Sequence, residues 1–129
     1  MAPNNEKATL GALGEELGCR YLKNKGYKII EKNYKNALGR RLGEIDIVAQ
    51  KGDTIVFVEV KTRLYRGEDT PLPEQNITHD KLKKLSKIAL HYLRERKKEY
   101  CPYTFDALAI FVEMGSKKAK IRHLESIFL

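Results

Sequence analysis

Two neighbouring segments of alternating apolar and polar residues constrain the fold of this chain most strongly. Residues 41–50 and 54–63 alternate with a period near two, which is typical of β-strands with one buried face. Gly52 and Asp53 lie between these segments and form a favoured two-residue hairpin loop. We therefore predict that the two segments pair as an antiparallel β-hairpin.

Three charged residues, Asp46, Glu59 and Lys61, lie inside this predicted hairpin. With Gly52 and Asp53 as the loop, Asp46 lies directly opposite Glu59. If the loop shifts by one residue, the two acids become diagonal neighbours on the same face, so either register brings the three charges together. Two carboxylates about 4 Å apart repel by roughly 4 kcal/mol at an effective dielectric constant of about 20, so a compensating charge is expected.

Two interpretations of this charged face stay open. In one, the face is solvated, and Glu44 and Lys61 form an ordinary cross-strand ion pair. In the other, the opposed acids hold a divalent cation, because carboxylates on rigid strands can each give an oxygen to Mg²⁺, which takes its remaining ligands from water and substrate phosphate. A lysine beside such an ion can orient or deprotonate an attacking water.

The rest of the chain predicts a polar tail over residues 1–7 and a single domain over residues 8–129. Hydrophobic periodicity and turn residues indicate helices at 8–25 and 79–99 and strands at 27–35, 41–50, 54–63, 103–113 and 119–128. This order predicts an α/β fold in which a central mixed sheet of about five strands is flanked by helices.

Each predicted helix has an apolar face. The first is expected to bury Leu10, Leu13, Leu17 and Tyr21. Thr78 is the expected N-cap of the second helix. That helix is expected to bury Leu82, Leu85, Ala89, Tyr92 and Leu93.

Glu15 and Glu16 of the first helix have different surroundings. Glu16 precedes Arg20 by one turn and is explained as a surface ion pair. Glu15 has no such partner and lies along small and apolar residues. It is either a solvated side chain or a further ligand for the cation at the hairpin.

Composition limits the partners and the chemistry. The chain has 25 Lys and Arg against 17 Asp and Glu, a net charge of +8, which favours a polyanionic partner unless the protein is simply cationic. Cys19 and Cys101 form no CxxC motif and are expected to be reduced core thiols, and His79, His91 and His123 lack metal-ligand spacing. No apolar run approaches the roughly 20 residues that span a bilayer, so a cytoplasmic protein without membrane contact is expected.

Several basic residues are candidate contacts to nucleic-acid phosphates. Lys81 and Lys84 lie on the second predicted helix, Arg63 follows the hairpin acids, and Arg40 and Arg41 precede the hairpin. The alternative for the lysines is an ordinary solvated helix face.

The segment "GEIDIVAQKGDTIVFVEVKTR" resembles the D-(x)n-ExK core of the restriction-endonuclease-like superfamily, with Asp46 as the first acid and residues 59–61 as the ExK. Together with "LGEELGCRYLKNKGYKIIEKNY", "HDKLKKL" and "FDALAI", it resembles the YraN-type bacterial family of predicted endonucleases over about residues 9–128. The resemblance implies a restriction-endonuclease-like fold similar to archaeal Holliday-junction resolvases, with a Mg²⁺-dependent phosphodiesterase site at which Mn²⁺ can substitute.

The catalytic residues of that superfamily match four positions of this chain: Glu15, Asp46, Glu59 and Lys61. Its metal ligands match the three acids among these four. The resemblance therefore implies an endonuclease that acts on DNA, with branched or recombination and repair intermediates as candidate substrates. An RNA nuclease stays open as an alternative, because phosphate chemistry does not distinguish the sugar, and so does a homodimer. The alternative is a non-catalytic nucleic-acid-binding or adaptor protein that keeps the fold. Asp106 is explained as a polar residue at a strand entry.

Overall fold

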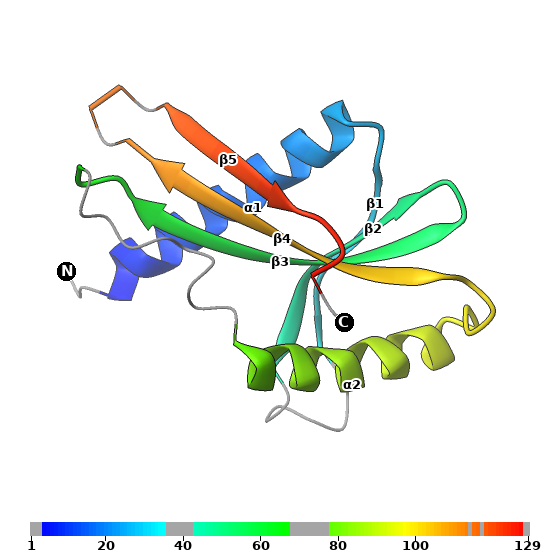
Figure 1. Ribbon diagram of the computed structural model, residues 1–129. Helices are drawn as coiled ribbons and strands as arrows, with labels where there is room; N and C mark the ends of the chain where they lie inside the picture. Colours follow the sequence, from blue (N-terminus) through cyan, green and yellow to red (C-terminus); the bar gives the residue numbers. More distant parts are fainter. Residues whose placement is uncertain (1–3, 36–42, 68–77, 114, 117, 128–129) are drawn as a thin grey trace.

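A computed structural model describes residues 4–35, 43–67, 78–113, 115–116 and 118–127. The elements are, in chain order, α1 (Asn4–Asn24), β1 (Lys28–Lys35), β2 (Glu44–Lys51), β3 (Thr54–Leu64), α2 (His79–Glu95), β4 (Tyr103–Val112) and β5 (Ala119–Leu124). The strands form one sheet in the order β1-β2-β3-β4-β5, antiparallel throughout except for the parallel pair β3 and β4 (Figure 1). This architecture confirms the predicted α/β class and is consistent with a restriction-endonuclease-like fold.

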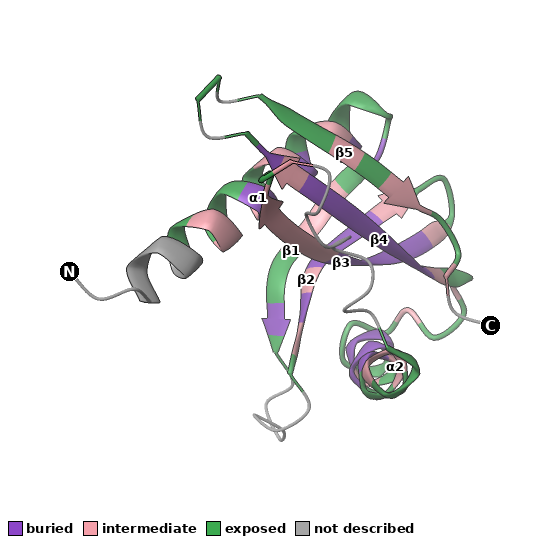
Figure 2. Cartoon of the chain, turned by 60° about the vertical axis from the view of Figure 1, so that its left-hand side comes forward, coloured by how far each residue is buried: buried purple, intermediate pink, exposed green. Residues whose placement is uncertain are grey.

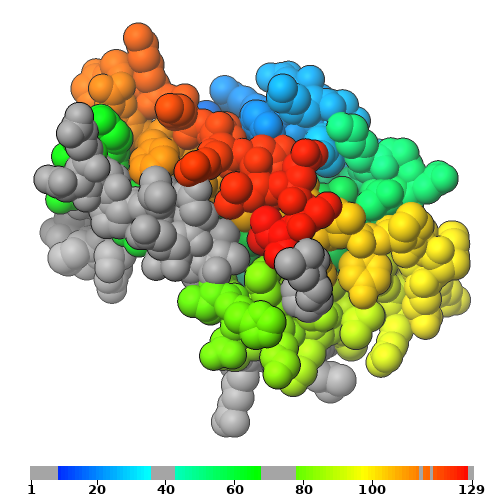
Figure 3. All heavy atoms as spheres, in the orientation of Figure 1, coloured from blue at the N-terminus to red at the C-terminus, as the bar shows by residue number. Residues whose placement is uncertain are grey.

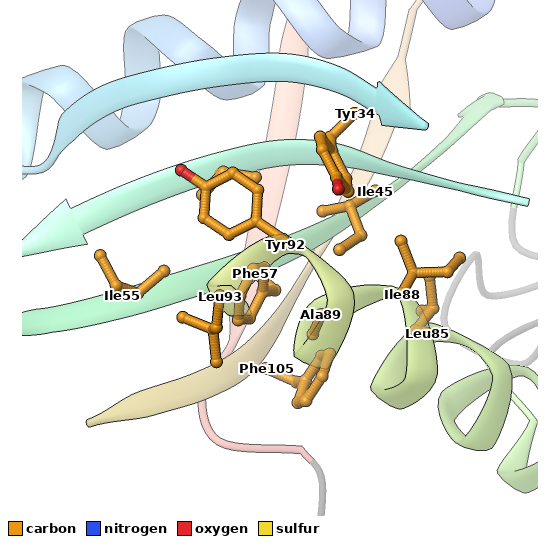
Figure 4. Packing of buried hydrophobic residues seen from close by; sticks show 11 residues of the cluster. Tyr34, Ile45, Ile55, Phe57, Leu85, Ile88, Ala89, Tyr92, Leu93 and Phe105 are labelled. Atoms are coloured by element: carbon orange, nitrogen blue, oxygen red, sulfur yellow. The ribbon is translucent and has the colours of Figure 1, made fainter. Parts of the chain in front are cut away.

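The helix α2 covers one face of the sheet over β1, β2, β3 and the start of β4. Its buried residues are Leu85, Ile88, Ala89, Tyr92 and Leu93, and Leu82 is partly buried, so the predicted apolar face is confirmed. The Tyr92 ring makes edge-to-face contacts with Tyr34 and Phe57, which ties the helix to two strands (Figure 4). In Figure 2, α2 is seen end-on with its buried residues turned toward the sheet.

The helix α1 packs on the opposite face, and three of the four residues predicted to face the core are partly buried against it: Leu10, Leu17 and Tyr21. Leu13 is 38% exposed, while Gly14, Gly18, Cys19 and Leu22 are buried. A Cβ placed on Gly14 would lie 1.8 Å from the Thr62 Oγ1, so the helix backbone approaches β3 too closely for any side chain there. The apolar periodicity therefore found part of the buried face but missed its centre, where two of the residues are glycines.

The ends of the helices follow from local backbone geometry. At the end of α1, Gly26 has φ of +93° and its N–H bonds to the Lys23 carbonyl, which closes the helix as predicted. At the start of α1, residues 4–7 are helical instead of forming a tail, because no residue after Pro3 breaks a helix. The model does not describe residues 1–3.

Thr78 caps α2 as predicted, since its hydroxyl accepts a hydrogen bond from the Lys81 N–H. The helix ends at Glu95, four residues before the predicted position. There Lys97 adopts φ of +56° and its N–H bonds to the Arg94 carbonyl, a geometry that terminates a helix.

The predicted hairpin is confirmed, including its loop and register. Lys51 lies opposite Thr54, and Gly52 has the positive φ of +60° that the turn requires. The last strand, β5, ends at Leu124, earlier than the predicted residue 128, because Ser126 has φ of +51° and donates its N–H to the Asp106 side chain.

Both cysteines are free thiols, Cys19 in the core and Cys101 half-buried against it, as predicted. Among the described residues, no helix is both long and apolar enough to cross a membrane.

Candidate active site

The pairing between β2 and β3 stops where the first predicted acid lies. The two strands pair from Lys51 and Thr54 as far as Ile47 and Val58. Beyond that pair, the Asp46 carboxylate accepts a hydrogen bond of 2.7 Å from the Val60 N–H. A side chain thus takes the place of a backbone acceptor, and Figure 1 shows β2 turning away from β3 beyond this point.

Acids from α1 and β2 converge at this divergence. Glu15, Glu44 and Asp46 each place one carboxylate oxygen so that the three oxygens lie within 4.8 Å of one another. The predicted meeting of Glu15 and Asp46 is therefore found. Glu44 is a third member of this cluster, and the sequence had instead indicated a cross-strand pair of Glu44 with Lys61.

The predicted cross-strand pair of Glu44 with Lys61 is wrong. Glu44 lies opposite Lys35 on β1, and the Lys35 Nζ is 3.7 Å from the Glu44 Oε2. The prediction extended the β2–β3 ladder past the point at which the strands separate. Lys61 consequently has a different ionic partner.

Burial and like charge act strongly on Asp46. Burial raises the pKa of this carboxyl to about 7, and Glu59 contributes in the same direction, while the hydrogen bond from Val60 opposes the shift. Glu15 and Glu44 raise the pKa further. Burial is thus the main effect on Asp46, and the neighbouring carboxylates add to it.

Glu59 lies on the α2 side of the sheet, where two lysines compensate its charge. Its side chain is 7% exposed, and its Oε1 is 2.6 Å from the Lys81 Nζ and 3.6 Å from the Lys61 Nζ. Glu59 is nevertheless close enough to Asp46 to be the strongest charge acting on it. The structure therefore joins acids from both faces of the sheet, with the two lysines on one side.

The two lysines differ in how firmly they hold a proton. Burial lowers the pKa of Lys61, and the neighbouring Lys81 ammonium lowers it further. Burial is the largest single effect on Lys81 and opposes its charge, but the hydrogen bond to Glu59, the contact with Lys61 and the charges of Glu59 and Asp46 together raise the pKa of Lys81. Lys61 is therefore the amine of the pair that is more readily deprotonated.

The other basic candidates are dispersed. Lys81 lies inside the site, bonded to Glu59, whereas Lys84 is exposed on the solvent side of α2. Arg63 is half-buried on β3, and its Nε is buried without a hydrogen-bond partner among the described residues. Arg40 and Arg41 lie outside the described residues.

A second polar cluster lies on the α1 face of the sheet. Asp106 is 3% exposed and accepts hydrogen bonds from the Ser126 N–H, at 3.0 Å, and from the His123 ring, at 2.7 Å between Oδ2 and Nε2. The other His123 nitrogen lies 3.2 Å from the Tyr21 hydroxyl. Asp106 is thus an interior residue of β4 that holds the C-terminal segment, and it is not at a strand entry as predicted. A polar residue within an apolar strand was its only signal in the sequence.

Comparison with known proteins gives consistent family names. The model of the family described as "Uncharacterised protein family UPF0102" matches residues 14–110. UPF0102 proteins of Syntrophomonas wolfei and Thermodesulfovibrio yellowstonii are each 44% identical over 119 residues, which is 92% of this chain and 96% and 95% of those relatives. A UPF0102 protein of Rhodococcus opacus is 38% identical over 92% of this chain and 95% of its own length. The chain therefore belongs to the UPF0102 family, as the YraN-type resemblance of its motifs predicted.

Proposed function

We propose that this protein is a metal-dependent endonuclease of the restriction-endonuclease-like superfamily that hydrolyses DNA phosphodiester bonds. One observation carries the proposal: Glu15 from α1 and Asp46 from β2 meet beside Glu59 and Lys61 of β3. Three elements, α1, β2 and β3, thus deliver charged groups to the point at which β2 and β3 diverge.

The donor set suits Mg²⁺, with Mn²⁺ as an alternative. All the nearby acidic ligands are carboxylate oxygens, and two ligands at the usual distance of about 2.1 Å from one ion are at most about 4.2 Å apart. The separation of up to 4.8 Å among Glu15, Glu44 and Asp46 therefore requires only small side-chain adjustments. Burial, and after it the Glu59 charge, raises the pKa of Asp46, and a divalent cation at this carboxylate would oppose both effects.

When bound, the ion would polarise a phosphate oxygen and lower the pKa of a water. In this proposal, Asp46, Glu15 and Glu59 would hold the ion near the point at which β2 and β3 diverge. Lys61 takes the proton of the attacking water or stabilises the charge that develops on the phosphate. Lys81 keeps its own charge and orients the Glu59 carboxylate, which it contacts at 2.6 Å.

DNA is the proposed substrate because the chain carries a net charge of +8, while its site is acidic. Such a distribution favours a polyanion that contacts basic residues around an acidic centre. Branched or recombination intermediates are the first substrates to test.

One observation favours a second candidate function, a nucleic-acid-binding or adaptor protein without catalysis. Lys81 and Lys61 already compensate Glu59, so this carboxylate does not require a cation for charge balance. In that case, the protein would bind DNA equally well in Mg²⁺ and in EDTA and would leave it intact.

The test compares the wild type with Asp46→Asn and Lys61→Ala on single-stranded, duplex and four-way-junction DNA, in Mg²⁺, Mn²⁺ and EDTA. The proposal predicts metal-dependent cutting by the wild type that both variants lose while they remain folded. Cutting that persists unchanged in both variants would identify a contaminant and refute the assignment. Binding without cutting on every substrate would favour the adaptor function.

A further inference from the structure

One face of the sheet carries two rows of basic residues beyond the part that α2 covers. In the first row, Lys61 pairs with Ala109 of β4, which pairs with Arg122 of β5. Residues paired directly across neighbouring strands lie on the same face of a sheet. Lys61 and Arg122 therefore lie on one face, two strand spacings or about 10 Å apart along the row.

The second row repeats this arrangement two residues further along β3. Arg63 pairs with Phe111, which pairs with Lys120. Two residues along a strand correspond to about 6.6 Å, so the rows are close neighbours. Both Lys120 and Arg122 are exposed, and β5 forms one edge of the sheet beside the almost fully buried β4 (Figure 2).

Past Glu59, the described strand residues give this face cations only. Past Glu59, the residues that β3, β4 and β5 place on it are Lys61, Arg63, Ala107, Ala109, Phe111, Lys120, Arg122 and Leu124. The described part of these strands thus adds four cations and no acid to this face. Basic residues next to an acidic site can contact the phosphates of a nucleic-acid strand whose cleaved bond lies in that site.

Two further observations point to a nucleic acid. The Arg63 Nε is buried and lacks an acceptor in the described part of the chain, and a phosphate oxygen is an acceptor that guanidinium groups bind well. Beside Arg63, the Tyr65 ring is 46% exposed and makes an edge contact with Phe111, with ring centroids 6.4 Å apart. A partly exposed aromatic ring among cations is a feature of surfaces on which bases stack.

We propose that the DNA backbone runs from the acidic site toward the β5 edge of the sheet, with Arg63, Lys120 and Arg122 as phosphate contacts. This inference rests on the proposed function for its ligand, and it adds an edge strand, β5, to the substrate-binding surface. Figure 3 shows that β5, in orange to red, reaches the surface of the molecule.

The sheet itself provides a matched control. Charges on an edge strand also discourage pairing between molecules, and the opposite edge strand, β1, carries the exposed residues Lys28 and Lys32. The double variants Lys120→Gln/Arg122→Gln and Lys28→Gln/Lys32→Gln each lower the net charge from +8 by two, to +6. They differ in which edge of the sheet loses its cations.

The experiment measures binding of labelled single-stranded and four-way-junction DNA in EDTA by fluorescence anisotropy over a range of salt concentrations. Loss of Lys120 and Arg122 is expected to weaken binding about tenfold or more and to reduce the salt slope by about 1.4 to 1.8, since each phosphate contact contributes roughly 0.7 to 0.9. The β1 double variant is expected to bind like the wild type. The charge-preserving Lys120→Arg/Arg122→Lys variant is expected to retain binding, which excludes a folding defect.

If both double variants bind DNA equally weakly, the loss of binding follows from net charge alone, and the proposal is overturned. A wild type that binds no DNA would also overturn it. These results are independent of catalysis. If the β5 variant alone loses binding while the wild type does not cut, the surface stands and the nuclease proposal fails. If the wild type cuts and the β5 variant binds as tightly, the nuclease proposal stands and this surface fails.

Discussion

The Lys81 Nζ, on the first turn of α2, lies 2.6 Å from the Glu59 Oε1 in the middle of β3. Thr78 fixes the backbone of that turn through its hydrogen bond from the Lys81 N–H. The start of α2 is thereby held against the acidic site. Because the Glu59 side chain is almost fully buried, this contact orients a group that has little contact with water.

Replacement of Lys81 by methionine is expected to reduce cleavage about 10- to 100-fold, because Glu59 loses its nearest cation and its orientation. The Lys87→Met variant removes the same charge from an exposed position of the same helix and should cut like the wild type. Single-turnover rates on the preferred DNA in Mg²⁺ measure both effects. Equal rates for the two variants would show that the contact with Glu59 has no part in catalysis.

Asp46→Asn is expected to stabilise the fold at neutral pH. The folded protein holds the Asp46 proton up to about pH 7, whereas the unfolded chain releases it near the ordinary value of 3.8. Stability of the wild type therefore falls as pH rises from about 4 to about 7, and this loss is absent in the variant. We expect a gain of roughly 1 to 4 kcal/mol in the free energy of unfolding at pH 8, where one pKa unit corresponds to about 1.4 kcal/mol.

Urea unfolding at pH 4.5 and pH 8, without divalent cations, measures this gain. Asparagine keeps an oxygen that can accept the Val60 hydrogen bond, so the comparison isolates the charge. Asp53→Asn removes an exposed charge in the hairpin loop and should change stability little at either pH. A pH-independent effect of Asp46→Asn would contradict the burial of an uncompensated carboxylate.

The contact of α1 with β3 predicts opposite effects for two glycines of one helix. A Cβ at Gly14 would lie 1.8 Å from the Thr62 Oγ1 and within 3.1 Å of its Cβ and Cγ2, so no Thr62 rotamer avoids the clash. Gly14→Ala should therefore cost about 1 to 3 kcal/mol and displace Glu15. A Cβ at Gly11 meets nothing within 4 Å, and Gly11→Ala should add about 0.5 to 1 kcal/mol. Thermal unfolding of the two variants measures both changes in stability. If Gly14→Ala leaves the stability unchanged, α1 must lie farther from the sheet than the structure shows.

Asp106 is expected to contribute to stability without taking part in catalysis. Asp106→Ala leaves the Ser126 N–H and the His123 Nε2 without their partner and should cost about 2 to 4 kcal/mol. The cutting rate per folded molecule should stay within about twofold of the wild type, as expected for a residue that contacts no reacting group. A stable Asp106→Ala protein that no longer cuts would assign Asp106 to the active site.

Local patterns predicted most of the fold. The loop at Gly52, the cap at Thr78 and the apolar face of α2 each depend on residues that are close in sequence, and all were found. The buried face of α1 was predicted in part. Leu10, Leu17 and Tyr21 pack against the core, but Leu13 is exposed, and the glycines at the centre of the face have no hydrophobic signal. The end of α2 depends on the left-handed conformation of Lys97, a residue that rarely adopts it.

The site was predictable where strand pairing determines it and was missed where pairing stops. The hairpin register brought Asp46 and Glu59 together, but extending it further assigned Lys61 to Glu44. The divergence of β2 and β3 depends on the Asp46 side chain accepting the Val60 N–H, a contact that no periodicity encodes. The contact of Lys81 with Glu59 depends on how α2 packs on the sheet, so the sequence did not predict it either.

Two adjacent residues of α1 test the central claim most directly, because Glu15 joins the carboxylate cluster and Glu16 pairs with Arg20 at the surface. The measurement is the single-turnover rate of DNA cutting in Mg²⁺ by the wild type, Glu15→Gln and Glu16→Gln. A metal-binding catalytic site predicts that Glu15→Gln loses about 10- to 100-fold or more while Glu16→Gln cuts like the wild type. Equal cutting by all three proteins, or none by the wild type on any DNA, would contradict the account.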